Sequence, residues 1–150
     1  RTISKYINFL IKSSVIRKIY NFSNNARKIE MKAKKLYPFC TTLTKYLGDD
    51  PNMSKIIECD VAFQTDAEFF WNYRNEEIDF ILLRNNIRKG LEVKYRNTIE
   101  HDDLKAFSSK RAEKLKLSEN FLIVKEYAKI NTSLGNITPI KYYTLWKANI

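Results

Sequence analysis

The first residues of the chain alternate apolar and basic side chains at a helical spacing. A repeat of about 3.6 residues is typical of a helix with one polar face. The pattern predicts a helix from Ile3 to Ile19, with lysines on its polar face and an apolar stripe formed by Ile7, Leu10, Ile11, Val15 and Ile19.

The next stretch predicts a hairpin and a short helix. A polar Ser23-Asn24-Asn25 turn follows the first helix, and basic residues continue from there through Tyr37. The segment from Thr41 to Leu47 predicts a helix that ends at Gly48, because glycine readily takes the left-handed conformation of a helix C-terminus. We therefore expect a helix, a basic hairpin and a second helix in this part of the chain.

A new helical pattern begins after Gly48. Asp49-Asp50-Pro51 suits the cap and first turn of a helix, which is expected to run from about Asn52 to Phe63. Three runs typical of strands follow, and Asn85-Asn86 supplies a tight turn between the last two. The short links predict an antiparallel meander formed by residues 67–73, 77–83 and 89–95.

The last part of the chain predicts one more helix and two more strands. Asp102 or Asp103 opens a helix that runs to about Leu115, and strands are expected at 120–125 and 140–146. The order from Asp50 onward is helix, three strands, helix, strand, strand. This order indicates an α/β fold with a mixed sheet.

Composition narrows the class of protein. Hydrophobic residues make up 44% of the 150 residues, while Gly and Pro number three each, which excludes disordered and collagen-like chains. No apolar run approaches the roughly 18 residues that span a bilayer.

Cys40 and Cys59 lack the spacing of a zinc site or a disulfide framework, so we expect both to pack in the core of a cytoplasmic protein. Without an initiator Met, the chain is expected to be an internal or C-terminal part of a longer protein.

The net charge of +10 is concentrated at one end of the chain. Residues 1–48 contain eleven Lys and Arg against one acidic residue, whereas residues 49–150 contain sixteen of each sign. A basic segment of this kind attracts polyanions such as nucleic acid, or an anionic membrane; a solvated face that keeps the protein soluble is the alternative. The candidates for phosphate contacts are Arg27, Lys28, Lys32, Lys34, Lys35 and Arg96.

Two carboxylates and a lysine stand out in the predicted meander. Glu92 and Lys94 are two residues apart and would share one strand face, while Asp79 lies inside an apolar run. A carboxylate in such a run needs a partner, commonly a cation, to offset the loss of hydration. If the strands pair across Asn85-Asn86, Asp79 and Glu92 come within reach of a single ion.

This arrangement has two interpretations. Two carboxylates with water ligands suit Mg²⁺, and a neighbouring lysine can orient or help deprotonate an attacking water, or stabilise charge on a phosphodiester. Alternatively, Lys94 neutralises Asp79 and Glu92 in a structural network of ion pairs.

Asp79 followed by Glu92-Val93-Lys94 resembles the D…(D/E)xK signature of the PD-(D/E)XK nuclease superfamily. The resemblance implies a restriction-endonuclease-like core with the element order given above. It also implies an acidic residue on the preceding helix, and Glu58 holds the matching place. On this resemblance Asp79, Glu92 and Glu58 would hold Mg²⁺ or Mn²⁺, and Lys94 would assist the nucleophile. The proline of the superfamily's name is absent before Asp79.

A narrower resemblance covers nearly the whole chain. Glu58, the Phe69-Phe70-Trp71 run, Asp79 and the Glu92-Val93-Lys94 strand follow one another in an order similar to the nuclease-like C-terminal region of archaeal AAA+-type ATPases of unknown function. This resemblance implies a winged-helix-like linker region at 1–48 and a nuclease-like domain at 49–150. The N-terminal ATPase region of the same polypeptide would be a partner. No Walker A glycines occur in this chain.

Two functional hypotheses follow. The first is a metal-dependent nuclease that acts on DNA more readily than on RNA and uses the basic hairpin to hold the polyanion. The second is a catalytically inactive module that binds nucleic acid or a sister subunit, for instance in a homo-oligomer. Neither hypothesis involves a membrane.

Overall fold

The computed structural model describes residues 2–47, 52–148 and 150. Its helices are α1 (Thr2–Lys12), α2 (Ala26–Met31), α3 (Thr41–Leu47) and α4 (Met53–Gln64), with short 3₁₀-helices η1 (His101–Leu104), η2 (Ala112–Leu115) and η3 (Tyr142–Lys147). Its strands are β1 (Ile16–Asn21), β2 (Lys34–Pro38), β3 (Phe69–Tyr73), β4 (Glu76–Arg84), β5 (Ile87–Lys94), β6 (Thr98–Ile99), β7 (Glu119–Val124), β8 (Lys129–Ile130) and β9 (Ile137–Lys141).

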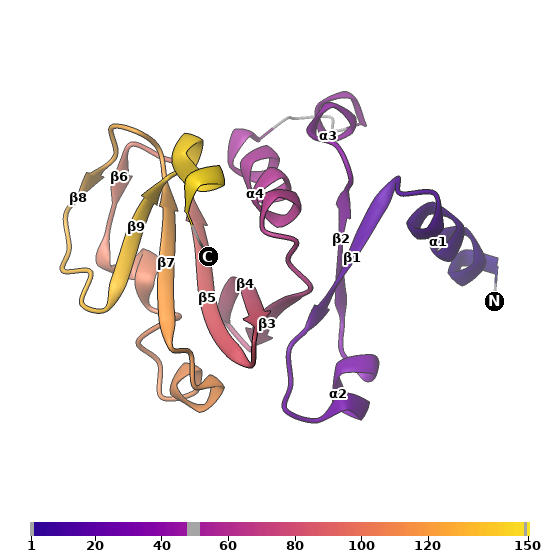
Figure 1. Cartoon of the computed structure of the whole chain (residues 1–150), viewed down its shortest axis with the longest axis horizontal. Coiled ribbons are helices and arrows are strands. Elements are labelled where there is room, and N and C mark those ends of the chain that lie inside the picture. Colours follow the sequence, from indigo (N-terminus) through magenta and orange to yellow (C-terminus); the bar gives the residue numbers. More distant parts are fainter. Residues whose placement is uncertain (1, 48–51, 149) are drawn as a thin grey trace.

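The described residues form one large mixed sheet, as expected for an α/β protein. Its seven strands follow the order β2-β1-β3-β4-β5-β7-β9, and β6 and β8 form a separate two-stranded ribbon. Figure 1 shows β1 and β2 on one side of the sheet and β7 and β9 on the other, with α1 projecting beyond β1. No helix in the described ranges is long and apolar enough to cross a membrane.

The predicted meander and the helix before it are confirmed. Strand β4 pairs antiparallel with both β3 and β5, and α4 begins behind Asn52, whose side chain accepts a hydrogen bond from the backbone of Ser54. The turn between β4 and β5 places Asn85 and Asn86 at φ values of 49° and 64°. Asparagine tolerates this left-handed conformation better than most residues, and such turns suit the twist of a hairpin.

The predicted helix from Ile3 to Ile19 is wrong in its second half. Helix α1 ends at Lys12, Ser14 adopts a left-handed φ of 54°, and the chain enters β1 at Ile16. Valine and isoleucine favour strands because their branched side chains pack well on a pleated surface. Ile19 is completely buried in the sheet, so packing in the core outweighs the helical spacing.

The basic hairpin is confirmed as an antiparallel pair, but it contains a helix and belongs to the main sheet. Strands β1 and β2 pair antiparallel, α2 joins them, and β1 also runs parallel to β3. The expected boundary between residues 48 and 49 and the Asp49-Asp50-Pro51 helix start lie outside the described residues. On either side of that gap, the chain contributes strands to one sheet.

The C-terminal part differs more from expectation. Two 3₁₀-helices, η1 and η2, replace the single helix expected at 102–115, and the strand expected at 140–146 ends at Lys141 before η3. Glu100 and Asp103 close a capping box around η1, and Lys116 at φ 54° ends η2. The strand expected at 120–125 is confirmed as β7, which runs parallel to β5.

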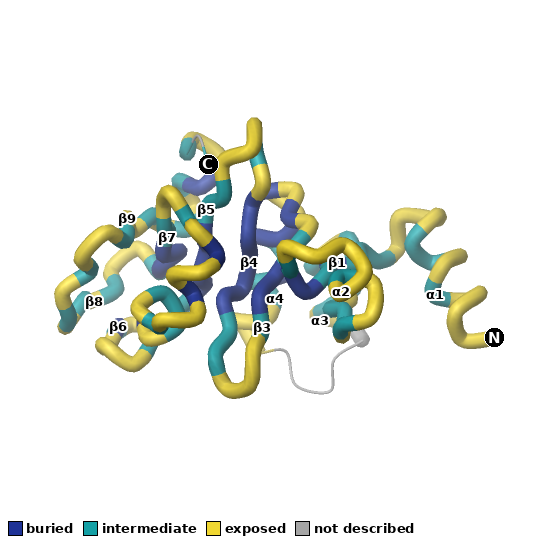
Figure 2. The backbone as a smooth tube through the Cα atoms, turned by 90° about the horizontal axis from the view of Figure 1, so that it is seen from below, coloured by how far each residue is buried: buried dark blue, intermediate teal, exposed yellow. Residues whose placement is uncertain are grey.

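The core has a layer on each face of the sheet. Helix α4 buries Ile57 and Val61 against one face, together with Phe80 of β4. The segment that contains η1 and η2 packs Ala112 and Leu115 on a second cluster that includes Trp71, Ile78 and Ile81. Figure 2 shows that burial is concentrated in the central strands, while α1 stays at the surface. Cys59 is buried as expected, whereas Cys40 is exposed.

Candidate functional site

The site forms where β4 and β5 separate. Their antiparallel register runs from the turn to the Phe80 and Leu91 pair, and Asp79 and Glu92 occupy the next positions. There, side chains replace the backbone ladder: the amide of Asp79 donates to Glu92 Oε2 at 3.2 Å, and the amide of Val93 donates to Asp79 Oδ2 at 2.8 Å. Each carboxylate is therefore fixed by the backbone of the neighbouring strand.

Lys94 completes the group. Its Nζ lies 2.5 Å from Glu92 Oε1, and Glu92 keeps only 5% of its surface exposed while Asp79 keeps 9%. The prediction that Asp79, Glu92 and Lys94 come together is confirmed. An ion pair in so buried a place is costly unless hydrogen bonds satisfy its remaining atoms, and the backbone amides at this site help to do so.

The two carboxyl groups share an environment that disfavours negative charge. Burial raises the pKa of both groups, and nearby negative charge raises it further, from Glu58 at Asp79 and from Asp79 at Glu92. Burial also acts to lower the pKa of Lys94, but attraction to Glu92 and Asp79 outweighs it and leaves that pKa raised. The environment therefore favours the protonated forms of both carboxyl groups more than water does.

An acidic cavity of about 470 Å³ opens beside this group. Among the described residues, its lining includes six carboxylates and two lysines, namely Glu76, Glu77, Asp79, Glu92, Asp102, Asp103, Lys94 and Lys105. Five of these carboxylates form ion pairs: Glu76 with Arg111, Glu77 with Lys35, Glu92 with Lys94, Asp102 with Lys105 and Asp103 with Arg96.

Asp79 is the exception. Within the described residues, no cation forms an ion pair with its carboxylate, and Oδ1 accepts no hydrogen bond from them. An ionised carboxylate that is buried without a cation costs several kcal/mol in principle. The cavity therefore borders a carboxylate whose charge is incompletely compensated.

Glu58 lies near the site but has other partners. Its Oε1 accepts the hydroxyl of Tyr37 at 2.5 Å and faces Nζ of Lys35 at 3.4 Å. Lys35 also reaches Glu77 Oε1 at 2.5 Å. Burial, followed by the charge of Glu58 and the hydrogen bond to it, raises the pKa of Tyr37, so the hydroxyl remains a proton donor to Glu58.

The arrangement fits a divalent ion held by two protein ligands rather than three. In the described part of the chain, no three His, Cys, Asp or Glu side chains come together in a way that could hold a metal. The predicted set of Glu58, Asp79 and Glu92 is thus not assembled around one point. Asp79 and Glu92 remain suitable, because Mg²⁺ commonly takes one or two carboxylates and completes its shell with water and phosphate oxygens.

The six predicted phosphate-binding residues fall into different environments. Arg27 and Lys28 lie exposed on α2. Three others have protein partners: Lys34 donates to the carbonyl of Glu30, Lys35 pairs with Glu58 and Glu77, and Arg96 pairs with Asp103. Lys32 contacts neutral oxygen atoms.

Sequence reasoning missed Tyr37 and Glu77 as parts of the site. Both depend on β2 lying beside β1 and reaching toward α4, which is a long-range contact. One local signal was present: Lys35 and Tyr37 are two residues apart on a strand and so project to the same side.

A comparison with models of protein families matches residues 60–143 to the family described as Domain of unknown function (DUF4143). No curated protein and no solved structure matches the chain. The matched stretch includes Asp79, Glu92 and Lys94, and it begins within α4 just after Glu58.

Proposed function

The chain belongs to the family described as Domain of unknown function (DUF4143), and we propose that it is a metal-dependent nuclease domain acting on DNA at the site of Asp79, Glu92 and Lys94. The observation that carries the proposal is the buried carboxylate of Asp79, which borders the acidic cavity beside Glu92 and forms no direct ion pair among the described residues, although Lys94 and Lys35 attract it.

A divalent cation is the ligand that best matches this charge distribution. The cavity carries more carboxylates than cations, and it would repel a phosphodiester unless positive charge were added. Mg²⁺ or Mn²⁺ would be held by Asp79 and Glu92. When bound, such an ion supplies Lewis-acid polarisation of a phosphate oxygen and a more acidic water.

The remaining residues would have positioning and proton-transfer roles. Lys94, anchored on Glu92 at 2.5 Å, would orient the nucleophilic water or stabilise charge on the phosphate. The backbone amides of Asp79 and Val93 hold the two carboxylates in place. Tyr37 and Lys35 would fix Glu58, whose negative charge acts on Asp79 from α4.

The wider setting of the proposal follows from the resemblance to PD-(D/E)XK nucleases. It would make this chain a nuclease-like C-terminal domain with an ATPase region earlier in the same polypeptide. DNA is the favoured substrate over RNA. Arg27 and Lys28 on the exposed helix α2 would contribute phosphate contacts, which are sequence-independent.

A second candidate is a non-catalytic nucleic-acid-binding or regulatory module. The ion pair of Lys94 with Glu92 and the backbone hydrogen bonds of both carboxylates favour it, because these contacts could serve structure alone. The two candidates differ in whether the pair binds a metal and whether the bound metal supports cleavage.

The test combines metal titration with a cleavage assay. Calorimetric titration with Mn²⁺ should show saturable binding to the wild-type chain and none to Asp79→Asn. With Mg²⁺ or Mn²⁺ present, supercoiled and single-stranded DNA should be cut, and Lys94→Met should slow cutting by about 100-fold or more, as expected for loss of a proton-transfer group.

Asp102→Asn is the matched control. It removes the same charge from the same cavity at an exposed position that pairs with Lys105, so it should leave Mn²⁺ binding and cleavage near wild type. Cleavage that persists in Asp79→Asn would exclude this site. Metal binding without cleavage would favour the second candidate, and no metal binding would refute the metal site.

A further inference from the structure

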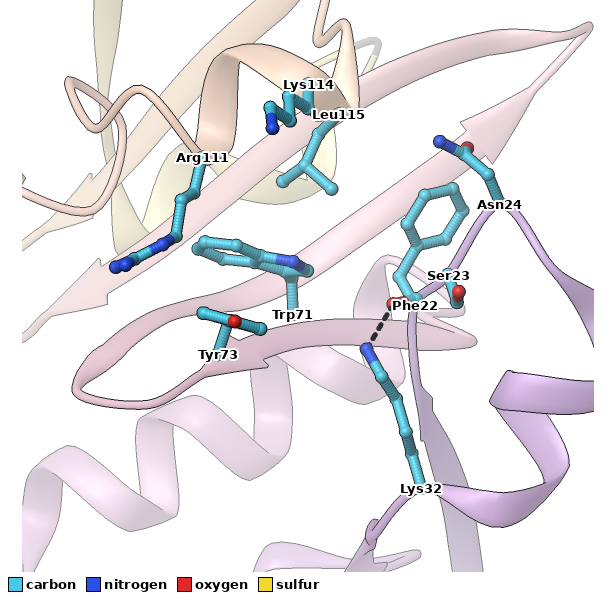
Figure 3. A pocket seen from close by; sticks show the side chains of 9 residues that line it. All are labelled: Phe22, Ser23, Asn24, Lys32, Trp71, Tyr73, Arg111, Lys114 and Leu115. Atoms are coloured by element: carbon cyan, nitrogen blue, oxygen red, sulfur yellow. Dashed lines mark hydrogen bonds between the residues drawn. The ribbon is translucent and has the colours of Figure 1, made fainter.

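A second cavity, separate from the acidic one, lies on the side of the sheet that η2 covers. It has a volume of about 300 Å³, and its lining residues come from the segment after β1, from the residue after α2, from β3 and from η2 with the residue before it. Figure 3 shows the nine side chains that line it, and none of them is acidic. It shares no lining residue with the acidic cavity.

Aromatic rings form one part of this cavity. Phe22 and Trp71 are buried, Tyr73 is 43% exposed, and all three contribute to the lining. In Figure 3 the indole of Trp71 lies between Arg111 and Phe22. Although Trp71 keeps only 6% of its surface exposed, its side chain is one of those that line the cavity. The wall of the cavity therefore includes flat aromatic rings.

Three cations form the other part. Nζ of Lys32 contacts neutral oxygens, Asn21 Oδ1 at 3.3 Å and the carbonyl of Phe22 at 3.1 Å, and within the described residues it has no carboxylate partner. Lys114 is exposed and likewise forms no ion pair with the described part of the chain. Arg111 lies 4.9 Å from the ring centre of Tyr73. Lys32 and Lys114 thus lack a carboxylate partner among the described residues, whereas Arg111 pairs with Glu76.

We propose that this cavity binds a nucleoside phosphate, with the base against Trp71 and Tyr73 and the phosphate between Lys32 and Lys114. Proteins commonly hold nucleotides with unpaired bases by aromatic side chains next to cations. The aromatic ring stacks on the base, and the cation neutralises the phosphate of the nucleotide. A base within a duplex is already stacked on both faces, so the ligand is a free nucleotide or one residue of a single strand.

The cavity has one link to the acidic site but does not depend on it. Arg111 pairs with Glu76 at 3.0 Å, and Glu76 lines the acidic cavity. The two cavities are therefore connected through this ion pair. Binding at the aromatic cavity requires no metal and no cleavage, so it can be measured in EDTA, whatever the outcome at the acidic site.

Tryptophan fluorescence gives a direct measurement. The chain has two tryptophans, and Trp146 is 73% exposed, so a Trp146→Phe background leaves Trp71 as the reporter. This variant is titrated in EDTA with thymidine and adenosine monophosphates, a single-stranded oligo(dT) and a duplex of the same length. Stacking on Trp71 should quench its emission with the nucleotides, the single strand, or both, and the duplex should bind more weakly.

Substitutions assign the binding to the cavity. Tyr73→Ala should weaken the single strand or nucleotide by about tenfold or more, the typical loss of a stacking partner. Lys114→Gln should lower the slope of log affinity against log salt by about one, as for one lost phosphate contact. Lys110→Gln removes the same charge at an exposed position outside the cavity and should change neither quantity.

The outcomes are distinct. Quenching by monophosphates identifies a free nucleotide as a sufficient ligand, and quenching by oligo(dT) alone identifies a residue of a single strand. No quenching by either, equal effects of Lys110→Gln and Lys114→Gln, or tighter binding of duplex than of single strand would overturn the proposal. Failure of cleavage at Asp79 leaves all of these measurements intact.

Discussion

Asp79 and Glu92 show how two single residues can shape a sheet. At these two positions the backbone hydrogen bonds between β4 and β5 stop. Each carboxylate instead accepts a hydrogen bond from a backbone amide that would otherwise need a partner on the neighbouring strand. Buried backbone donors must be satisfied in some way. The two carboxylates therefore link the strands through side-chain hydrogen bonds in place of backbone ones. The strands lie farther apart at this point, which leaves room for the acidic cavity.

The raised pKa values of this pair predict a pH-dependent stability. Burial is the first cause at both residues, so above the ordinary carboxyl range near about pH 4 the folded state binds more protons than the unfolded state. Their contribution to stability is full below that range and is lost as pH rises through the folded-state pKa values. Denaturant titrations should show the free energy of unfolding falling between about pH 5 and pH 8.

Glu92→Gln should flatten this fall, by up to about 1.4 kcal/mol per pH unit for one group. The other charged groups around the pair are Glu58 on α4, Lys35 on β2 and Lys94 on β5, and they stay in place in this variant. Glu113→Gln, at an exposed position, should keep the wild-type pH slope. A slope in Glu92→Gln identical to that of the control would show that the buried pair does not titrate.

The site could be predicted only as far as local pattern reaches. A two-residue turn at Asn85-Asn86 fixes the register of β4 and β5, so alternation along the chain was enough to bring Asp79 near Glu92. The contact of Tyr37 with Glu58 joins residues 21 positions apart through tertiary packing. No repeat in the sequence indicates this long-range contact. Glu58 was therefore expected to be a metal ligand, and its contacts with Tyr37 and Lys35 were not foreseen.

At the scale of elements, the segment from η1 to η2 depends on a glycine in β5. A Cβ at Gly90 would lie 2.7 Å from Asn120 Oδ1, 2.7 Å from Phe107 and 2.8 Å from Leu117. These distances are too short for any real Cβ contact. The absence of a side chain at Gly90 is what lets this segment lie close to the sheet, where it borders both cavities.

Gly90→Ala should therefore destabilise the protein by about 1–3 kcal/mol, the usual cost of overpacking a core. The measurement is the midpoint of chemical denaturation at constant slope. Adding Leu117→Ala should recover part of the loss, because it removes one of the atoms that clash. If Leu117→Ala deepened the loss by its full single-mutant effect, steric overlap with that side chain would not be the cause.

The same segment explains where element prediction failed. Asp102, Asp103 and the following residues favour a helix start, and a continuous helix to Leu115 was expected. The spacing of the buried residues Leu104, Ala112 and Leu115 would suit one helix face, yet the capping box of Glu100 and Asp103 closes only one short turn. Packing over β4 and β5 decided the conformation, and local propensity could not anticipate it.

At the scale of the molecule, the excess positive charge is less available than its total suggests. Lys35 and Arg96 are committed to carboxylates of the acidic site, whereas Arg27 and Lys28 are exposed on α2. Replacing both with glutamine should lower the salt slope of DNA binding by about two. The measurement is fluorescence anisotropy of labelled DNA over a range of salt concentrations.

Lys129→Gln with Lys141→Gln is the matched control for charge. Both residues are exposed in β8 and β9, so this pair lowers the net charge equally without touching α2. If both double variants changed the slope equally, net charge rather than α2 would govern binding.

The parallel contact between β1 and β3 has a consequence for how the protein opens. β1 meets β3 through two residue pairs, Tyr20 with Phe69 and Asn21 with Phe70, which is the shortest strand pairing in the main sheet, and short contacts open more easily than long ones. In hydrogen-exchange measurements, the backbone amides between β1 and β3 should therefore be among the least protected of the main sheet. This opening would take Lys35 and Tyr37 away from Glu58. One local fluctuation would therefore expose the edge of β3 and free the side chain of Glu58 on α4, whose charge acts on Asp79.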